Sequence, residues 1–247
     1  MELLVFHNIL NDNGVKAIIG NNYSEALMYL IDFCETKSVT DLAVKEYIVN
    51  LLIEEENILS VLESRKKKVG DDLYRAALTD IKQIYKYLFN APIKYVPSGN
   101  PVEFSKEYKA SVVKLTASES AEELLENLCT HYRTLGNGEL SRYVAFKYSD
   151  TIKGVVQDRS VTLDSLVGLQ HQKEILISNT KGFVSGKASN NVLLFGDRGT
   201  GKSSSVKAIA NHFRNEGLRI IEIRKDQLRD IPLLIDNLSK NPLKFII

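Results

Sequence analysis

The chain has 247 residues, enough for one large or two small domains. Hydrophobic residues make up 44% and charged residues 26%, which excludes a disordered or collagen-like chain. No stretch approaches the roughly 18 uncharged apolar residues of a membrane-spanning helix, and the N-terminus lacks the pattern of a secretory signal. Cys34 and Cys129 lie far apart and indicate small buried side chains in a reducing compartment. We therefore expect a cytoplasmic protein with no membrane partner.

Charge is distributed unevenly along the chain, although the formal net charge is only +1. Residues 151–247 carry 15 Lys and Arg against 9 Asp and Glu, a net of +6. Residues 1–150 carry 17 against 22, a net of −5. A basic C-terminal part suits an anionic ligand, such as a nucleoside triphosphate or a nucleic acid.

The first 140 residues repeat apolar side chains at helical spacing, which predicts a mainly helical N-terminal domain over residues 1–140. One helix is expected to begin with a capping box at Asn22–Glu25. A second begins at Ser38–Asp41 and continues through Leu62. It is expected to end in the basic run Arg65–Lys68, where cations meet the negative end of the helix dipole. A nucleic-acid patch is the alternative interpretation of this run, and a solvated helix end is favoured.

Two further helices complete this domain. The third is expected to start near Asp71, and the fourth places Ala121 to Tyr132 on one face and ends at Gly136. Between them, no helix is expected to cross residues 91–101, which contain three of the five prolines.

Residues 141–162 are interpreted as short strands and a linker, with Tyr143–Tyr148 and Thr151–Val156 pairing across a tight turn. Strands and helices then alternate. The expected elements are a helix near Gln170–Ser178, a strand at Asn190–Phe195, a helix at Lys202–Arg214, a strand at Arg219–Ile223, a helix over about 231–239, and a strand at Leu243–Ile247. This alternation predicts an α/β domain over residues 163–247, with a parallel sheet and crossover helices.

One motif in this domain carries chemistry. Residues Gly196–Ser203 read GDRGTGKS and match the phosphate-binding loop G-x-x-x-x-G-K-[ST], between a predicted strand and a predicted helix. Glycine at 196, 199 and 201 permits backbone angles that a side chain would forbid. The backbone amides of residues 199–204, those of Thr200 and Ser204 included, are expected to surround a phosphate at the positive end of the helix.

Two side chains of the motif are expected to act directly on a bound nucleotide. Lys202 should reach the β- and γ-phosphates as a mobile positive charge and is the candidate catalytic residue. The Ser203 hydroxyl should bind Mg²⁺. An ordinary glycine-rich turn is the alternative to this interpretation.

Residues Leu163–Gln170, followed by Gln172–Glu174, resemble the start of AAA+ ATPase modules. The longer run is similar to a bacterial group of AAA+-like ATP-binding proteins classed as a domain of unknown function. Matching pieces are Asn179-Thr180, Asn190–Leu194, Gly199–Ser204 and Gly217–Arg219. The resemblance implies a P-loop NTPase that binds ATP or ADP, with Val167 and Gly168 contacting the base and Gly199 to Ser204 holding the phosphates.

In that family, a Walker B acidic pair ends the strand that corresponds to Lys244–Ile247, and sensor residues, an arginine finger and a helical lid follow it. None of these is present in this sequence, so we expect an N-terminal piece of a longer, Mg²⁺-dependent ATPase whose full-length form could assemble as a homo-oligomer, and we expect this piece to bind nucleotide with little hydrolysis. The family's strand order, 5-1-4-3-2, would leave a gap beside this strand. A GTPase-like order would instead pair it with the strand before the loop.

Two other functions are left open by the sequence. The helical domain could engage a protein partner while the phosphate loop is vestigial. Alternatively, the basic C-terminal part could serve a nucleic-acid remodelling helper that resembles a helicase loader. Nucleotide binding that depends on Lys202 would favour an ATPase over a vestigial loop. Salt-sensitive binding to single-stranded DNA would favour the nucleic-acid remodelling helper.

Overall fold

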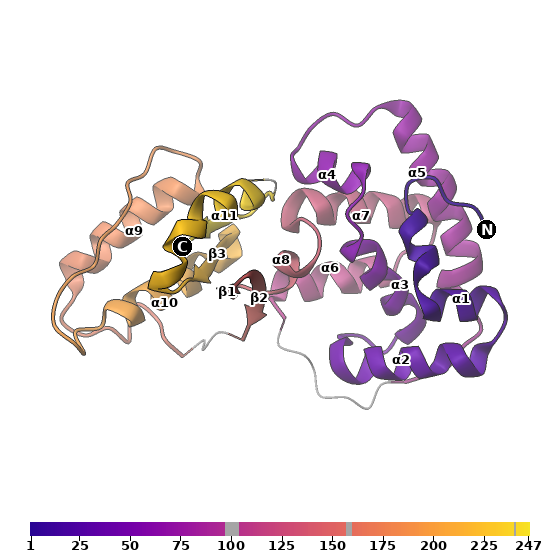
Figure 1. The fold of residues 1–247 in the computed structure, drawn as a ribbon, viewed down its shortest axis with the longest axis horizontal. Coiled ribbons are helices and arrows are strands. Elements are labelled where there is room, and N and C mark those ends of the chain that lie inside the picture. Colours follow the sequence, from indigo (N-terminus) through magenta and orange to yellow (C-terminus); the bar gives the residue numbers. More distant parts are fainter. Residues whose placement is uncertain (97–103, 157–159, 240) are drawn as a thin grey trace. The chain divides into compact units, whose positions relative to one another are not determined.

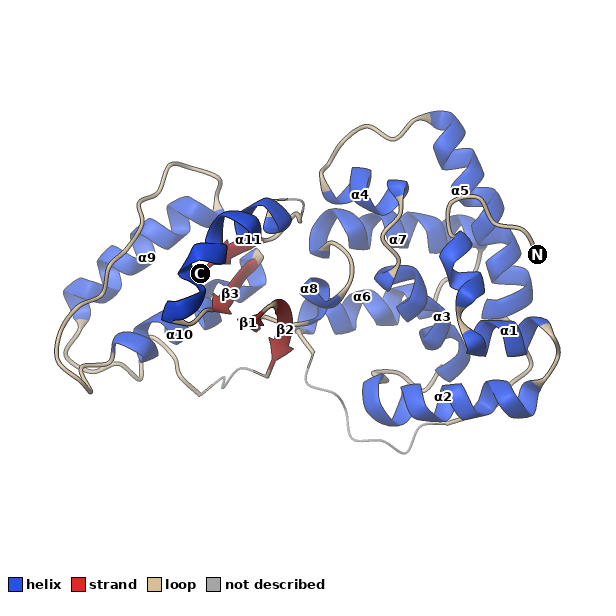
Figure 2. Cartoon of the chain, in the orientation of Figure 1, coloured by secondary structure: helices blue, strands red, loops and turns tan. Residues whose placement is uncertain are grey.

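The computed structural model describes residues 1–96, 104–156, 160–239 and 241–247, and the chain divides into two compact units (Figure 1). The first unit comprises Met1–Arg142 with Ser239–Pro242, and the second comprises Tyr143–Leu238 with Leu243–Ile247. In the described residues, the first unit contains helices without strands, and all four strands lie in the second (Figure 2). The chain is therefore a helical unit joined to a mixed α/β unit.

The helical unit contains short and long helices packed around an apolar core. Its elements are η1 (His7–Asn11), α1 (Asn13–Ile19), α2 (Tyr23–Lys37), α3 (Ala43–Glu54), α4 (Ile58–Ser64), α5 (Asp71–Ile84), η2 (Tyr85–Phe89), α6 (Lys106–Thr116), α7 (Ala121–Leu135) and α8 (Glu139–Arg142). The predicted helices starting near Asp71 and covering Ala121 to Tyr132 are confirmed as α5 and α7. Both cysteines are buried as expected, and burial raises the pKa of each thiol to about 12.

The start of α2 is confirmed, whereas the start of α3 differs from the prediction. The Asn22 side chain accepts a hydrogen bond from the Glu25 backbone N–H and caps α2, but the predicted capping box is incomplete, because the Glu25 carboxylate accepts from the Asn22 side-chain amide and not from its backbone N–H. α3 begins at Ala43, after the Ser38–Asp41 signal, and has no side-chain cap. Here the hydroxyl groups of Ser38 and Thr40 donate to the buried Glu46 carboxylate, which also accepts the Thr40 N–H at 2.8 Å. A carboxylate within the helix therefore organises the turn before it.

The single helix predicted through Leu62 is wrong, because the structure contains two helices, α3 and α4. The Asn57 side chain accepts from the Ser60 N–H at 2.9 Å, and Ser60 Oγ accepts from the Asn57 N–H at 3.0 Å. This capping box starts a new helix inside the periodic pattern. The last carbonyls of α3 bond elsewhere, since Tyr132 donates to Leu52 O and the Gly138 N–H donates to Ile53 O. The break thus lets α3 hold α7 and the turn that follows it.

Three α-helices, α1, α6 and α8, were not predicted. α1 and α6 have seven and eleven residues and are capped by Asp12 and Ser105, and α8 has four residues. Residues 91–96 are not helical, as expected, and the remainder of the proline-rich segment, 97–101, lies outside the described residues.

The buried carboxylate of Asp80 on α5 fixes the N-terminal segment to the helical unit. It accepts backbone N–H groups from Leu4, Val5 and Phe6 at distances between 2.6 and 3.1 Å. Asp80 is 1% exposed and Phe6 is fully buried. Because hydrogen bonds to a charged acceptor are stronger than neutral ones, this carboxylate anchors the segment that places Phe6 in the core.

We expect Asp80→Asn to lower the free energy of unfolding by about 2–4 kcal/mol, because three backbone amides, two of them buried, lose a charged acceptor. Urea denaturation measures this change. Asp72→Asn is the matched control, since the Asp72 side chain is 96% exposed, and it should stay within about 0.5 kcal/mol of wild type. A loss of less than about 1 kcal/mol for Asp80→Asn would contradict the anchoring role.

His131 on α7 is buried and neutral. Ser111 Oγ lies 2.8 Å from its Nδ1. Burial, followed by the nearby Arg142 charge, lowers the pKa of His131 to about 3. The folded state therefore binds fewer protons at this site than the unfolded state at any pH between about 3 and the ordinary value of 6.5.

We expect this histidine to make the helical unit less stable as pH falls below about 6.5, by about 1.4 kcal/mol per pH unit. Urea denaturation of wild type and His131→Asn between pH 7 and 4 tests the effect. The difference between the two unfolding free energies should shrink as pH falls. Parallel curves would show that His131 is not held neutral in the fold.

The α/β unit contains a four-stranded mixed sheet with helices packed against it. Its elements are β1 (Ala145–Ser149), β2 (Thr151–Val155), α9 (Gln170–Val184), α10 (Lys202–Phe213), η3 (Arg214–Glu216), β3 (Leu218–Glu222), η4 (Lys225–Asp230), α11 (Ile231–Leu238) and β4 (Lys244–Ile246). The strand order is β2-β1-β3-β4. β1 and β2 are antiparallel, whereas β1–β3 and β3–β4 are parallel.

Most predicted elements of this unit are confirmed. The β1–β2 hairpin turns at Asp150, and its register pairs Ser149 with Thr151. β3, α10, α11 and β4 lie where the alternation places them, and α9 extends beyond the predicted end to Val184. In the described part of the chain, no helix is both long and apolar enough to cross a bilayer.

The predicted strand at Asn190–Phe195 is wrong, because this segment forms no regular structure and therefore pairs with neither β3 nor β4. Leu193 is 84% exposed and Phe195 is 89% exposed. A short apolar run is a strand only when a neighbouring strand satisfies its backbone groups. Here a cavity of about 540 Å³, lined in part by Leu194, Phe245 and Ile246, lies between the segment and β4.

Candidate functional site

The predicted phosphate loop leads directly into α10. The helix begins at Lys202, and Gly201 precedes it in a left-handed conformation, with φ of 83°. Gly199 has φ of 84° and Gly196 has φ of 139°, so glycine is used where other residues would be strained. The loop from Gly196 to Thr200 is exposed to solvent. An exposed loop of this conformation at a helix N-terminus is suited to binding an anion.

The ammonium group of Lys202 closes the loop. Its Nζ donates to Gly196 O at 2.9 Å and to Asp197 O at 2.6 Å, and it lies 3.4 Å from Thr200 Oγ1. Thr200 Oγ1 also donates to Asp197 O at 2.8 Å. Lys202 itself is half-buried. The positive charge is therefore held at the centre of the loop, next to the first turn of the helix.

Two residues outside the motif position its N-terminal side. The Asn179 side chain on α9 accepts from the Asn190 N–H and donates to Asn190 O, both at 2.9 Å. Half-buried Leu194 packs on the apolar cluster that contains Leu176 and Ile209. Asn179 and Leu194 thus position the segment before the loop, a role that the sequence predicts for a strand.

The predicted base-binding residues lie in the turn before α9. Val167 is 91% exposed, and Gly168 is exposed with φ of 76°. The next residue, Leu169, lies close to the loop. If Gly201 carried a Cβ atom, that atom would lie 3.4 Å from Leu169 Cδ1. The turn and the loop are therefore neighbours at this point, as a shared site requires.

The two serines after Lys202 lie in the first turn of α10. Ser203 is exposed and Ser204 is half-buried. Among the described residues, the exposed Ser203 hydroxyl forms no hydrogen bond, which leaves it accessible to a metal ion. Ser205 is committed to the helix, since its Oγ donates to Gly201 O at 3.0 Å.

Sequence reasoning missed the roles of Asn179 and Leu194. Asn179 belongs to a run that matched the family resemblance, but no local pattern links it to Asn190, eleven residues later. Leu194 lies between exposed Leu193 and Phe195, but the run Val192–Phe195 is apolar throughout, so no sequence pattern marks Leu194 as the inward-facing residue.

Residues 141–247 match the model of a domain family described as "Protein of unknown function (DUF815)". The match spans β1 to β4 and includes the loop, α9 and α10. This part of the chain is therefore similar to an uncharacterised domain family. No curated protein and no solved structure matches the chain.

We expect Asn179→Ala to release the segment before the loop, because Asn190 loses both of its backbone hydrogen bonds to that side chain. Hydrogen exchange of the Asn190 amide should accelerate about fivefold, the effect of one hydrogen bond worth about 1 kcal/mol. Asn191→Ala removes an exposed neighbouring amide and should leave the rate unchanged. Equal rates in wild type and Asn179→Ala would show that the side chain does not hold the segment.

Proposed function

We propose that the loop Gly196–Ser204 binds the phosphates of ATP together with Mg²⁺. The single observation that carries this proposal is the loop itself, with left-handed glycines that lead into α10 and the Lys202 ammonium at its centre. A polyphosphate needs closely approaching donors without side-chain bulk. The basic composition of residues 151–247 also favours an anionic ligand.

Each residue of the loop has a defined role in this proposal. The backbone amides of Gly199 to Ser204 would donate to phosphate oxygens, and Lys202 would exchange carbonyl partners for phosphate charge. The residues present fit Mg²⁺ as well, because the Ser203 hydroxyl is exposed in the first helical turn. Mg²⁺ would supply charge neutralisation of the phosphates.

We further propose that the domain is an AAA+-like P-loop ATPase module. Its resemblance to that class implies that the base would lie beside Val167 and Gly168, and the proximity of Leu169 to Gly201 supports a site shared by this turn and the loop. The cavity beside β4 lies where the class would have a further strand. Because phosphoryl transfer also needs a carboxylate that orients water, and the resemblance assigns none of the matched residues to that role, we expect binding with little hydrolysis.

We expect Lys202→Ala to weaken the binding of Mg·ATP at least about tenfold, since the loop loses its central cation. Isothermal titration calorimetry measures the affinity. Lys207→Ala is the matched control, because Lys207 lies on the exposed side of the same helix and the change in net charge is identical. Equal affinity in wild type and Lys202→Ala would refute nucleotide binding by this loop.

The Ser203→Ala variant distinguishes metal binding from nucleotide binding. Its affinity for Mg·ATP should fall, whereas its affinity for ATP measured with a chelator should match that of wild type. An equal fall under both conditions would assign Ser203 to phosphate binding and not to the metal.

A further inference from the structure

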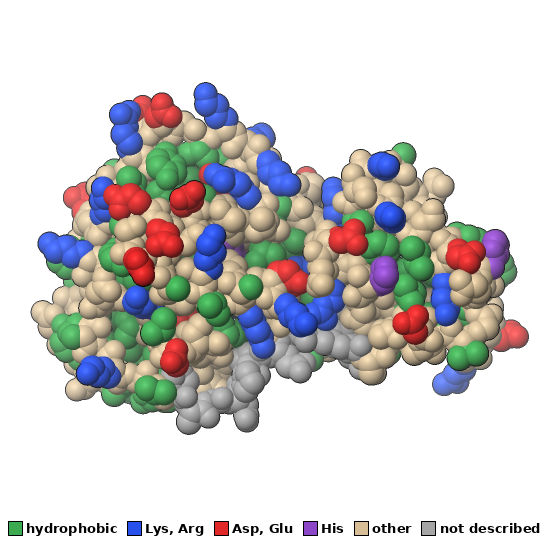
Figure 3. All heavy atoms as spheres, turned by 180° about the vertical axis from the view of Figure 1, so that it is seen from behind, with side chains coloured by type: hydrophobic (Ala, Val, Ile, Leu, Met, Phe, Trp, Pro, Cys, Tyr) green, Lys and Arg blue, Asp and Glu red, His purple; other side chains and the backbone are tan. Residues whose placement is uncertain are grey.

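A basic cleft lies on the helical unit, independent of the phosphate loop. It is formed by the end of α4, the connection to α5, the start of α5 and the last turn of α7, and its volume is about 770 Å³. Its lining includes five cationic side chains: Lys66, Lys67, Lys68, Arg75 and Arg133. Figure 3 shows Lys and Arg side chains along the upper edge of the helical unit, the edge that carries the α4–α5 connection in Figure 1.

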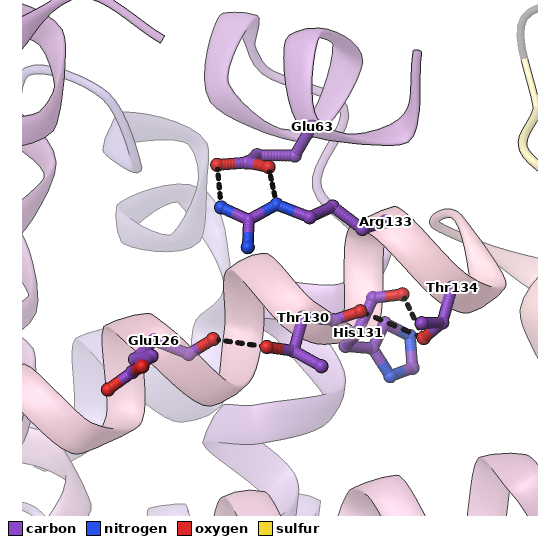
Figure 4. Close-up of polar contacts among 6 residues, drawn as sticks. All are labelled: Glu63, Glu126, Thr130, His131, Arg133 and Thr134. Carbon is purple, nitrogen blue, oxygen red and sulfur yellow. Dashed lines mark hydrogen bonds and ion pairs between the residues drawn. The ribbon is translucent and has the colours of Figure 1, made fainter. Parts of the chain in front are cut away.

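The acidic groups of the cleft are largely neutralised. Glu63 is buried on α4, and both of its carboxylate oxygens accept from the Arg133 guanidinium, which reaches it from α7 (Figure 4). Arg75 bonds to exposed Asp72. In contrast, within the described part of the chain, no carboxylate lies within 4 Å of the ammonium groups of Lys66, Lys67 or Lys68. Asp71 is the remaining acid in the lining, so the cleft has a net positive charge.

The backbone turn that carries these lysines contains a residue in an unfavourable conformation. After α4, the Lys66 N–H bonds to Glu63 O and the Lys67 N–H bonds to Leu62 O, both at 2.9 Å. This pair of bonds is a Schellman turn, which usually has glycine at the left-handed position. Here that position is Lys66, with φ of 52°. The other non-glycine residues with positive φ in the described chain are Asn21 and Asp150, types that tolerate this conformation.

An aromatic ring completes the cleft. Tyr74 on α5 lines it and is 39% exposed. Exposed aromatic rings beside a row of cations are the elements with which proteins bind single-stranded nucleic acids, because the cations follow the phosphates and the rings stack on bases. An acidic peptide would pair with the cations but has no base to stack on the ring.

We propose that this basic cleft binds single-stranded nucleic acid, with phosphates beside Lys66, Lys67 and Lys68 and a base stacked on Tyr74. This interaction does not depend on the proposed nucleotide site. It assigns a function to the basic run that the sequence alone favours as a solvated helix end.

Fluorescence anisotropy with a labelled oligothymidylate, measured across a range of salt concentrations, tests the proposal. The triple variant Lys66→Ala, Lys67→Ala and Lys68→Ala should bind at least about tenfold more weakly at low salt. Its log–log salt slope should be smaller by about 2, the loss of three phosphate contacts on a single strand. The control triple variant Lys16→Ala, Lys37→Ala and Lys114→Ala removes the same charge from exposed sites of the same unit and should bind like wild type.

Three single substitutions separate binding from folding. Lys66→Gly should raise the thermal unfolding midpoint, because glycine relieves the left-handed position, and should still weaken binding. Tyr74→Ala should weaken binding about fivefold or more, whereas Tyr74→Phe keeps the ring and should bind like wild type.

Several results would overturn the proposal. These are the absence of binding by wild type at low salt, equal binding by the two triple variants, and unchanged affinity in Tyr74→Ala. Displacement of the oligonucleotide by polyglutamate at equal charge concentration would assign the cleft to an acidic protein. Lys202→Ala should bind the oligonucleotide like wild type. If that variant fails to bind, the nucleic acid occupies the phosphate loop instead of the cleft.

Discussion

The bonds between the Lys202 ammonium and the carbonyls of Gly196 and Asp197 determine the shape of the candidate site. A cation at the centre of a short loop draws carbonyl oxygens inward, and the glycines at 199 and 201 supply the backbone angles that this curvature requires. The same loop ends in the N-terminus of α10, where unbonded amides gather. Phosphate binding would therefore replace one set of oxygens around Lys202 with another, without the refolding of the loop.

Positive charge is used differently in the two units. In the α/β unit, one lysine is half-buried and bonded within a glycine-rich loop, an arrangement suited to a compact polyphosphate. In the helical unit, three successive lysines are exposed beside Tyr74, an arrangement suited to an extended chain of phosphates. The ion pair between buried Glu63 and exposed Arg133 holds α4 to α7 beside these lysines. The two proposals thus rest on separate residues and are tested separately.

The sequence predicts elements whose signals are local. The capped start of α2 at Asn22, the β1–β2 hairpin around Asp150 and the start of α10 at Lys202 depend on a few neighbouring residues, and all are found. The break between α3 and α4 depends in part on Tyr132 and Gly138, about eighty residues away, which bond the carbonyls of α3. Apolar periodicity contains no information about such partners.

The same distinction applies to the candidate site. Spacing in the sequence places the glycines in a loop and Lys202 and Ser203 at the start of the helix that follows it, and this arrangement is found. The strand expected before the loop is absent because Asn190 bonds to a side chain of α9 and not to a neighbouring strand. Whether a short apolar run becomes a strand depends on what lies beside it, which the run itself does not specify.

The most direct test of the central claim is a titration of the ¹⁵N-labelled chain with Mg·ATP, followed through backbone amide chemical shifts. Nucleotide binding by the loop predicts that the largest shifts occur at Gly199 to Ser204 and near Gly168, whereas amides of the helical unit change little. The absence of shifts in the loop at millimolar Mg·ATP, or changes confined to the lysines after α4, would contradict it.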